Sequence, residues 1–407
     1  MINQYAGSPS LGMEYRPHWM SLEWQKTGHD VLVVTGDHSH LRLGQPQVGV
    51  HTIEGVRYLT LRTFPYDSNG PRRFANILSF RAQLKWMTAP LVRWQPDVVI
   101  ASSTHPMDVR PAVRVADRAG AKFVYEIHDL WPLTPRLLGG MSEAHPMIRW
   151  MQREEDFGCR EAELCVSLLP GTEQYMVDHG LKRGRWVFVP NGIPDDEPEE
   201  RPTEGSPEAI QLFKLEFPRV IVFAGGHAPV ANLAPLLGQM SRLGSAGVGV
   251  VLVGEGPSKH ELQQRFGRLP NVLFLDPVPR AAIPALLAEC SVGYLGAQPI
   301  ALYKYGVSPN KLFDYMAAGL PVIDNNNQES SLVAQLECGF VADPSDEATL
   351  AVALDSVVAM STDELLSMGS RGRHFVRSEL RQSLLAGRFL AALASPGTSD
   401  SKGKLTF

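Results

Sequence analysis

The regular alternation of apolar runs and helical segments is the feature that most constrains the fold of this 407-residue chain. Apolar runs that end in polar or glycine residues occur at HDVLVVTG (29–36), PDVVIASS (96–103) and AKFVYEIHD (121–129). Between the last two lies the helical pattern HPMDVRPAVRVADRAG. Strands buried on both faces read as near-continuous apolar runs, and helices connect them. The pattern predicts a parallel sheet wound with helices.

The alternation starts again near residue 218, after a segment of different composition. The later runs are PRVIVFAGG, GVGVVLVGEG, NVLFLDPV, SVGYLGA and LPVIDNNN. The intervening segment PNGIPDDEPEERPTEGSPE (190–208) is dense in proline, glycine and acid, as linkers are. We therefore expect two doubly wound α/β domains, at 1–190 and 208–370, joined by a linker at 191–207. A helix at 371–394 closes the chain and is expected to cross back to the N-terminal domain.

Composition excludes several classes of protein. The chain is 44% hydrophobic and 20% charged with a net charge of −5, whereas a nucleic-acid-binding domain is usually basic. No apolar run approaches the roughly 18 residues of a membrane span, and the start MINQYAGSPS lacks the basic and apolar regions of a signal peptide. The four cysteines show no metal-binding spacing. We expect a cytoplasmic protein that does not bind nucleic acid.

The stretch SPNKLFDYMAAGLPVI (308–323) predicts a short helix that holds an anion. Ser308 can cap the helix, Pro309 suits its first turn, and Gly319 can end it in the left-handed conformation. Lys311 and Asp314 share one face. A lysine at a helix N-terminus is unfavourable, because the helix dipole is positive there. Its presence is explained if the lysine and the helix N-terminus hold an anion together.

Two glycine-rich loops follow predicted strands. FAGGHAP (223–229) places Gly225 and Gly226 where backbone amides can approach a phosphate, although a tight turn explains them equally well. LVGEGPSKHEL (252–262), with Gly254 and Glu255, lacks the last glycine of the dinucleotide fingerprint, so it is weak evidence for NAD. Lys304 adds a second cation near the short helix.

Several of these strings occur together in one known family. SPNKLFDYMAAGLPVI resembles the donor-site motif of retaining GT-B glycosyltransferases of family 4, and so do LVGEGP, NVLFLDPVPRAAIPALLAECSVGYL and VPNGIP. GSPSLGMEYRPHWMSLEWQKTGHDVLVVTG and VYEIHDLWP resemble a bacterial subgroup that builds cell-surface polysaccharides, including transferases of N-acetylated deoxyhexoses. The resemblance implies two Rossmann-like domains that face a cleft.

The resemblance also implies a reaction and a set of residues. A sugar would move from a nucleotide-diphosphate sugar, UDP- rather than GDP-linked, to a carbohydrate acceptor that is lipid-linked, without a resident cofactor. No DxD-type acid pair follows a predicted strand, so we expect no metal requirement. The expected donor-binding residues are Gly225, Gly226, Gly254, Glu255, Lys304, Ser308, Pro309, Asn310, Lys311, Leu312 and Asp314.

The chain departs from the family pattern at two places. The family carries two acids eight residues apart, but Gly306 stands at the first position and the shorter Asp314 at the second. The helix after the Gly-Gly loop contains no Lys or Arg before Arg242. Lys304 and Lys311 would therefore neutralise the diphosphate, and we assign Asp314 to the ribose.

On the N-terminal side, the resemblance places His128 near the transferred sugar. It would donate a hydrogen bond to a sugar hydroxyl or orient the acceptor; a general base would suit an inverting reaction instead. In the retaining front-face mechanism, the leaving diphosphate receives the acceptor proton, and its electrostatic stabilisation is the main contribution of the protein. Further acceptor-side candidates are Gly12, Glu14, Arg16 and Asp129.

The segment GPRRFANILSFRAQLKWMTAPLVRW (70–94) carries five cations and no acid, with aromatic residues between them. A basic amphipathic helix of this kind suits an anionic membrane surface and would bring the enzyme to a lipid-linked acceptor. An ordinary helix with buried aromatic residues explains the pattern equally well.

Two further functions stay open at this point. A nucleotide-sugar epimerase of GT-B architecture would turn over its substrate without an acceptor. A degenerate sugar-nucleotide-binding protein without activity is the second, because the first family acid is missing at Gly306. A nicotinamide-dependent dehydrogenase is disfavoured, since neither glycine loop completes the fingerprint.

Overall fold

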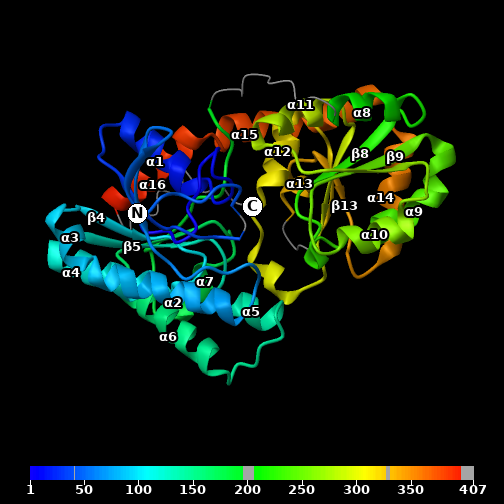
Figure 1. The fold of residues 1–407 in the computed structure, drawn as a ribbon. Coiled ribbons are helices and arrows are strands. Elements are labelled where there is room, and N and C mark those ends of the chain that lie inside the picture. Colours follow the sequence, from blue (N-terminus) through cyan, green and yellow to red (C-terminus); the bar gives the residue numbers. More distant parts are fainter. Residues whose placement is uncertain (41, 196–205, 327–330, 396–407) are drawn as a thin grey trace. The chain divides into compact units, whose positions relative to one another are not determined.

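A computed structural model describes residues 1–40, 42–195, 206–326 and 331–395 (Figure 1). The chain divides into two compact units, which are described separately below. The N-terminal unit consists of Met1–Asn191 together with the helix α16 (Gln382–Ala394), and the C-terminal unit spans Gly192–Arg381. Most of the expected linker at 191–207 lies outside the described residues.

The N-terminal unit is built on a largely parallel sheet. A four-stranded part has the order β4-β5-β6-β7, and a three-stranded part has the order β1-β3-β2, in which β2 runs antiparallel to β3. The strands are β1 (Leu32–Gly36), β2 (Gly49–Ile53), β3 (Val56–Leu61), β4 (Val98–Ala101), β5 (Lys122–Ile127), β6 (Leu164–Ser167) and β7 (Trp186–Phe188). The alternation of the sequence predicted β1, β4 and β5.

The first residues of the chain join the two parts of this sheet. Ile2 forms parallel bridges with Val34 of β1 and with Ala101 of β4. Its amide donates to the carbonyl of Ile100, and its carbonyl accepts from the amide of Ser102, both at 2.8 Å. Residues 1–3 therefore act as a very short central strand, which brings the loop that follows them to the carboxyl ends of β4 and β5.

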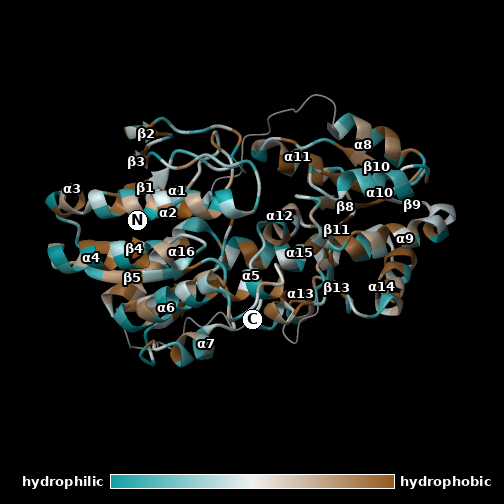
Figure 2. Ribbon diagram, turned by 60° about the horizontal axis from the view of Figure 1, so that its bottom comes forward, coloured by the Kyte–Doolittle hydropathy of each residue, from teal (hydrophilic) through white to brown (hydrophobic). Residues whose placement is uncertain are grey.

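Helices cover the N-terminal sheet, and their amphipathic patterns explain their placement. The buried positions of α4 fall on one face, and its other face carries arginines and an aspartate. Figure 2 shows the same mixture of hydrophobic and hydrophilic turns on the helices. The helices are α1 (Arg16–Lys26), α2 (Pro71–Trp86), α3 (Thr88–Arg93), α4 (Val109–Ala119), α5 (Leu133–Leu137), α6 (Pro146–Glu161), α7 (Glu173–Asp178) and α16.

The C-terminal unit contains a six-stranded sheet of order β10-β9-β8-β11-β12-β13, and every pairing in it is parallel. The strands are β8 (Arg219–Ala224), β9 (Val248–Val253), β10 (Val272–Leu275), β11 (Val292–Gly296), β12 (Val322–Asn325) and β13 (Gly339–Val341). The helices are α8 (Ser206–Lys214), α9 (Ala234–Leu243), α10 (Lys259–Phe266), α11 (Ile283–Ala288), α12 (Asn310–Ala318), α13 (Leu332–Gln335), α14 (Glu347–Ala359) and α15 (Thr362–Glu379).

The core of this unit lies between its sheet and the flanking helices. Strands β8 and β9 are buried along most of their length, and their side chains pack against α9 and α14 in one cluster. Burial of apolar surface at roughly 25 cal/mol per Å² is the main stabilising contribution to such a core. The sheet is therefore a rigid support whose carboxyl edge carries the glycine loops and the start of α12.

The short helix predicted from SPNKLFDYMAAGLPVI is α12, with one correction at its start. Pro309 is the N-cap residue, and no side chain caps the helix, so the expected cap by Ser308 is wrong. The extended conformation of Pro309, with ψ 128°, carries the chain into the helix instead. At the other end Gly319 adopts φ 75°, which confirms the predicted left-handed C-cap.

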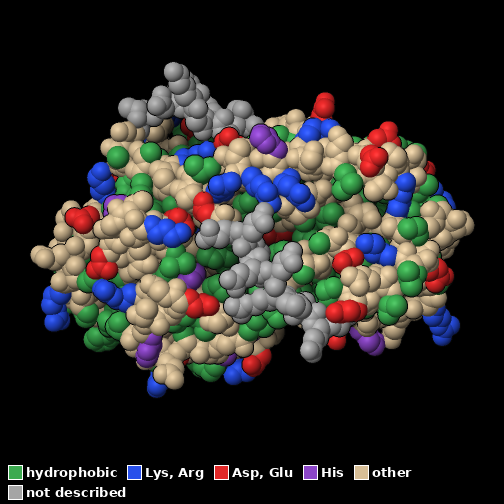
Figure 3. Space-filling view, turned by 90° about the horizontal axis from the view of Figure 1, so that it is seen from above, with side chains coloured by type: hydrophobic (Ala, Val, Ile, Leu, Met, Phe, Trp, Pro, Cys, Tyr) green, Lys and Arg blue, Asp and Glu red, His purple; other side chains and the backbone are tan. Residues whose placement is uncertain are grey.

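The chain closes with two helices. The segment expected as one helix at 371–394 contains the end of α15 and all of α16, with a break at Leu380 and Arg381. Figure 3 views the molecule from the side on which α15 lies, and shows Lys and Arg side chains gathered in a row. Arg373 on α15 donates to the carbonyl of Ala318 in the last turn of α12, where a cation is favourable.

Candidate active site

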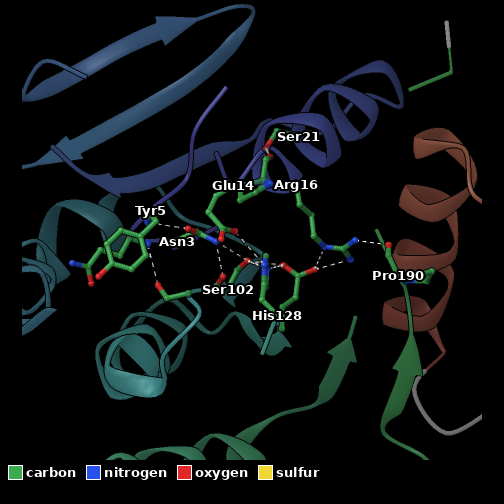
Figure 4. Close-up of polar contacts among 12 residues, drawn as sticks. Asn3, Tyr5, Glu14, Arg16, Ser21, Ser102, His128 and Pro190 are labelled. Atoms are coloured by element: carbon green, nitrogen blue, oxygen red, sulfur yellow. Dashed lines mark hydrogen bonds and ion pairs between the residues drawn. The ribbon is translucent and has the colours of Figure 1, made fainter. Parts of the chain in front are cut away.

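A buried carboxylate, Glu126 on β5, is the centre of a polar network in the N-terminal unit (Figure 4). Its Oε1 accepts from Arg16 Nε at 3.0 Å, and Arg16 also donates from Nη1 to the carbonyl of Pro190 at 2.7 Å. Its Oε2 accepts from Ser102 Oγ at 2.6 Å and lies 3.1 Å from His128 Nε2. Glu126 thus links side chains from β5, α1 and the end of β4.

The network keeps both of its titratable partners charged. Burial by itself raises the pKa of Glu126, but Arg16, His128 and Ser102 outweigh it and lower this pKa to about 2. Burial likewise opposes the protonation of His128, but Glu126 and Glu14 outweigh it and raise the pKa of His128 to about 9. His128 is therefore an imidazolium near pH 7, and this form donates hydrogen bonds and cannot accept a proton.

Glu14 approaches His128 from the opposite side. Its Oε2 lies 3.5 Å from His128 Nδ1, and its side chain is 22% exposed. Glu14 has φ 55° and Gly12 has φ 80°, so the loop before α1 turns sharply. The loop folds back on Gly7, where a Cβ atom would lie 1.8 Å from the carbonyl oxygen of Gly12. Only glycine fits at position 7, and the fit fixes where Glu14 points.

Two of the acceptor-side candidates have other partners in the structure. The Arg16 side chain is only 4% exposed and pairs with Glu126, so we reassign it from acceptor contact to support of the network. Asp129 accepts at Oδ1 from the amide of Leu130 and from Thr134 Oγ1, both at 2.8 Å. Its carboxylate thereby organises the loop that leads into α5.

The network also contains residues that the sequence patterns did not single out. Glu126, Ser102 and Asn3 are absent from the expected site, although Asn3 Nδ2 donates to the Ser102 carbonyl at 2.6 Å. One signal was present, because Glu126 is an acid within an apolar strand and stands two residues before His128. Side chains two apart in a strand point to the same face.

In the C-terminal unit, the two glycine loops are joined along their backbones. The amide of Gly225 donates to the carbonyl of Val253, and the amide of His227 donates to that of Glu255, both at 2.9 Å. A Cβ atom on Gly254 would lie 2.1 Å from the carbonyl oxygen of Gly225. These glycines therefore permit close contact of two loops at the carboxyl ends of β8 and β9.

Lys311 at the start of α12 points toward these loops. Its Nζ lies 4.1 Å from the centre of the Phe223 ring, and a Cβ atom on Gly225 would lie 3.1 Å from it. Among the described residues no carboxylate forms an ion pair with Lys311. Burial lowers the pKa of Lys311 to about 8. A half-buried lysine without a counter-ion at a helix N-terminus is suited to an anion.

Asp314, one turn further along α12, is held by a residue that the sequence analysis did not predict. Arg280 donates from Nη1 and Nη2 to the two carboxylate oxygens of Asp314. The pair is largely buried, with side-chain exposures of 24% and 14%. Asp314 therefore does not stand alone at the predicted ribose position.

The other expected donor residues lie around this edge. Lys304 is exposed on the turn before α12, with Nζ 4.9 Å from the centre of the Tyr305 ring. Asn310 is the exposed first residue of α12 and Leu312 is buried in its first turn. Glu255 accepts from Lys259 Nζ at 3.0 Å and is mostly exposed. Gly226 is exposed at the tip of its loop.

One group of metal-ligand type occurs among the described residues, and none of its members is an expected site residue. Glu155 and Asp156 on α6 and His179 after α7 place their ligand atoms within 4.8 Å of one another. Gln152 Nε2 donates to Glu155 Oε2 and to Asp156 Oδ1, both at 2.8 Å, and His179 Nδ1 lies 2.8 Å from Asp156 Oδ1. Hydrogen bonds within the group explain its arrangement.

Part of the positive charge of the basic segment 70–94 contacts other side chains of the N-terminal unit and is not free on the surface. Arg81 pairs with the buried Glu154 at 3.2 Å, and Arg73 lies over the rings of Tyr5 and Trp131. Phe80 is fully buried. The exposed members near the end of the segment are Lys85, Arg93 and Trp86, the last with an exposed fraction of 81%. The basic surface is therefore smaller than the sequence suggests.

Comparison with known families matches each unit to a domain of sugar transfer. Residues 12–192 match the model described as Glycosyl transferase 4-like domain. Residues 218–360 match the model described as Glycosyl transferases group 1. No curated protein matches the chain in sequence.

Solved structures share the fold over nearly the whole chain. Sucrose-phosphate synthase from Thermosynechococcus elongatus is 16% identical with a TM-score of 0.73, covering 97% of this chain and 99% of that one. Anabaena HepE in complex with UDP-glucose is 14% identical with a TM-score of 0.66, covering 97% and 98%. WaaG, a glycosyltransferase involved in lipopolysaccharide biosynthesis, is 15% identical with a TM-score of 0.66, covering 98% and 100%.

The two Rossmann-like units define the GT-B fold, as the sequence resemblance predicted. With a glycosyl transferase 4-like domain followed by a group 1 domain, the chain is a glycosyltransferase, an enzyme that transfers a sugar from a nucleotide sugar. Within the described parts of the chain, no helix has the length and hydropathy needed to span a membrane.

Proposed function

We propose that this glycosyltransferase moves a sugar from a UDP-sugar to a lipid-linked carbohydrate, with retention of configuration and without a metal ion. The resemblance to polysaccharide-building enzymes supports a role in cell-surface glycan synthesis, with an N-acetylated deoxyhexose as the transferred sugar. The observation that carries the proposal is the start of α12, where Lys311 lies beside the glycine loops and has no carboxylate partner within the described part of the chain.

The diphosphate and the ribose of the donor each have residues suited to them. The diphosphate would lie against Lys311 and the backbone of the Gly225 and Gly254 loops, with the exposed Lys304 adding positive charge. Asp314 would accept from the ribose hydroxyls, because a carboxylate held by Arg280 keeps lone pairs for further donors. UDP is favoured over GDP because the similar Anabaena HepE structures contain UDP, UDP with glucose, or UDP-glucose.

The charge on His128 favours retention over inversion. An inverting transfer needs a base for the acceptor hydroxyl, and an imidazolium cannot accept that proton. In the front-face reaction the bond from the anomeric carbon to the phosphate oxygen breaks, and the acceptor oxygen bonds to that carbon on the same face. The acceptor proton then goes to the leaving phosphate oxygen, whose negative charge Lys311 would stabilise.

A lipid-linked acceptor requires approach to a membrane surface. Lys85, Trp86 and Arg93 are exposed within nine residues, and an aromatic side chain with flanking cations suits the interface of an anionic bilayer. This supports a peripheral association of the N-terminal unit, narrower than the whole segment 70–94.

A thermal-shift screen of nucleotides and nucleotide sugars tests the donor part directly. A ligand that binds the folded state stabilises it by mass action. We expect UDP and one or more UDP-sugars to raise the melting temperature of the wild type, and uridine to have little effect. Equal shifts with uridine and UDP would contradict a diphosphate site at Lys311. Stronger shifts with GDP-sugars would overturn the choice of base.

A further inference from the structure

We propose that Glu126 is a positioning residue that fixes His128 with Nε2 turned inward, so that Nδ1 is the ring nitrogen that donates to the substrate. Glu14 is then the group that occupies Nδ1 in the free enzyme and yields it when the substrate binds. This inference rests on the proposed function, because the substrate is the donor sugar or its diphosphate.

The inward side of His128 is held from three elements. Glu126 is fully buried, and each of its oxygens has partners, Arg16 at Oε1 and Ser102 at Oε2. Ser102 Oγ lies 2.9 Å from His128 Nε2, beside the contact of this nitrogen with Glu126 at 3.1 Å. The carboxylate therefore cannot rotate away without breaking its bonds to Arg16 and Ser102. A ring nitrogen held by a fixed acceptor defines the position of the whole imidazole.

The outward side of His128 is held weakly by comparison. Glu14 Oε2 lies 3.5 Å from Nδ1, at the limit of a hydrogen bond, and it belongs to a partly exposed side chain on a loop. Among the described residues, no other acceptor contacts Nδ1. Figure 4 shows Glu14 and Ser102 reaching His128 from different elements. A sugar hydroxyl or a phosphate oxygen would complete a shorter bond in place of Glu14.

The charged groups around the imidazole of His128 all favour its protonated form. Glu126 comes from β5 and Glu14 from the loop before α1, and both face the imidazole. Arg16 on α1 faces Glu126 and keeps it ionised. Asp129 follows along the chain, and its Oδ1 holds Leu130 and Thr134. Two carboxylates against one imidazole make Nδ1–H a charge-assisted donor, which binds oxygen more strongly than a neutral one.

Nuclear magnetic resonance on the free enzyme tests the inference without any assay of transfer. Histidine labelled with ¹⁵N is incorporated into the wild type. The ¹⁵N signals of the His128 ring are identified because they are missing from the spectrum of His128→Asn. We expect both ring nitrogens to be protonated at pH 7.5. A neutral His128 ring at pH 7.5 would overturn the inference. Since no sugar is transferred, this result stands even if the proposed donor is wrong.

Two substitutions then separate the roles of the carboxylates. Glu126→Gln should lower the pKa of His128 by at least about one unit, because a buried charge at hydrogen-bond distance is lost. Glu14→Gln should lower it less, and Glu143→Gln, which neutralises an exposed carboxylate on the same unit, should leave it unchanged. An effect of Glu14→Gln equal to or larger than that of Glu126→Gln would contradict the assignment of inward and outward nitrogens.

The pH profile of turnover gives a readout that a merely structural role would not move. The activity of Glu126→Gln relative to the wild type should fall as the pH rises from 6 to 8.5, by up to about tenfold per unit once His128 loses its proton. A constant ratio would show that Glu126 acts only in folding and would overturn the inference. If Glu126→Gln does not fold, Ser102→Ala replaces it with the same expected direction, and the wild-type spectrum still decides.

Discussion

Glu126 Oε2 lies 3.1 Å from Nε2 of His128, which stands two residues further along the chain, directly after the end of β5. The contact joins an acid that the sequence patterns left unassigned to the histidine that they placed at the reaction. It raises the pKa of that histidine, and our proposal of a retaining reaction depends on the resulting charge. The predictions below test this site and the donor edge of the C-terminal unit.

Replacing Lys311 by alanine should weaken the binding of UDP far more than that of uridine. Lys311 has no carboxylate partner among the described residues, so its charge is available to the diphosphate. Hydrogen bonds to charged groups contribute about 1.5 to 3 kcal/mol, or roughly 10- to 100-fold in Kd. Isothermal titration calorimetry measures both ligands, with exposed Lys182→Ala as the control. Equal losses of affinity for UDP and uridine would show that Lys311 does not bind the diphosphate.

We predict that the C-terminal unit loses stability at acidic pH because His227 is buried. The ring is fully buried, and neither ring nitrogen has a hydrogen-bond partner among the residues that the structure describes. Burial lowers the pKa of His227 to about 4. Below its ordinary pKa of about 6.5, the unfolded chain binds a proton that the folded chain does not, so stability falls as the pH is lowered from 6.5 toward 4. The penalty reaches at most about 3 kcal/mol.

His227→Leu should therefore lose less stability than the wild type between pH 7 and pH 5, as measured by urea unfolding. Exposed His374→Leu in the same unit is the matched control and should follow the wild type. If His227→Leu shows the same pH dependence as the wild type, folding does not lower the pKa of the ring and the prediction is wrong.

Gly7→Ala should reduce turnover while the enzyme stays folded. The new Cβ atom would lie 1.8 Å from Gly12 O and 1.9 Å from Met13 O, so the loop that positions Glu14 must shift. A displacement of about 1 Å in a catalytic constellation can cost about 100-fold in rate. Gly387→Ala in α16 meets no atom within 4 Å and should keep full turnover with slightly higher stability. Wild-type turnover in Gly7→Ala would remove the loop from the site.

Removing the exposed group Lys85, Trp86 and Arg93 together should reduce binding to vesicles that contain anionic lipid. The triple alanine variant loses two cations and an interfacial aromatic side chain, at about 1 kcal/mol per cation near the surface. Lys182 and Arg183, exposed on the same unit, provide a double-alanine control that removes the same charge. Flotation assays with anionic and neutral vesicles measure the effect. Unchanged flotation, or an equal loss of flotation in the control variant, would contradict the assignment of this group to membrane binding.

The sequence predicted what depends on local pattern. The apolar runs located β1, β4, β5 and β8 to β12, because a buried parallel strand is continuous in the sequence, but they missed the short β13. The left-handed Gly319 was predictable because an αL residue at a helix end is usually glycine. The cap at Ser308 failed because several residues can begin a helix, and the neighbouring Pro309 took that place with its extended backbone.

The pairings that define the site could not be predicted, because they join residues far apart in the chain. Arg16 and Glu126 are separated by 110 positions, and Arg280 and Asp314 by 34. Arg73 and Arg81 looked like surface cations until the aromatic rings and Glu154 around them were placed. A periodic pattern shows which face a side chain takes, and it does not show what lies opposite.

The central claim is sugar transfer from a nucleotide-diphosphate sugar. The most direct test is turnover of the donor that the thermal-shift screen identifies. Purified enzyme is incubated with that donor, with and without a panel of lipid-linked sugars, and the release of nucleoside diphosphate is followed. We predict release that depends on a lipid-linked acceptor, with a product that keeps the anomeric configuration of the donor. Conversion of the donor to another nucleotide sugar without any acceptor, or no turnover with any acceptor, would contradict the account.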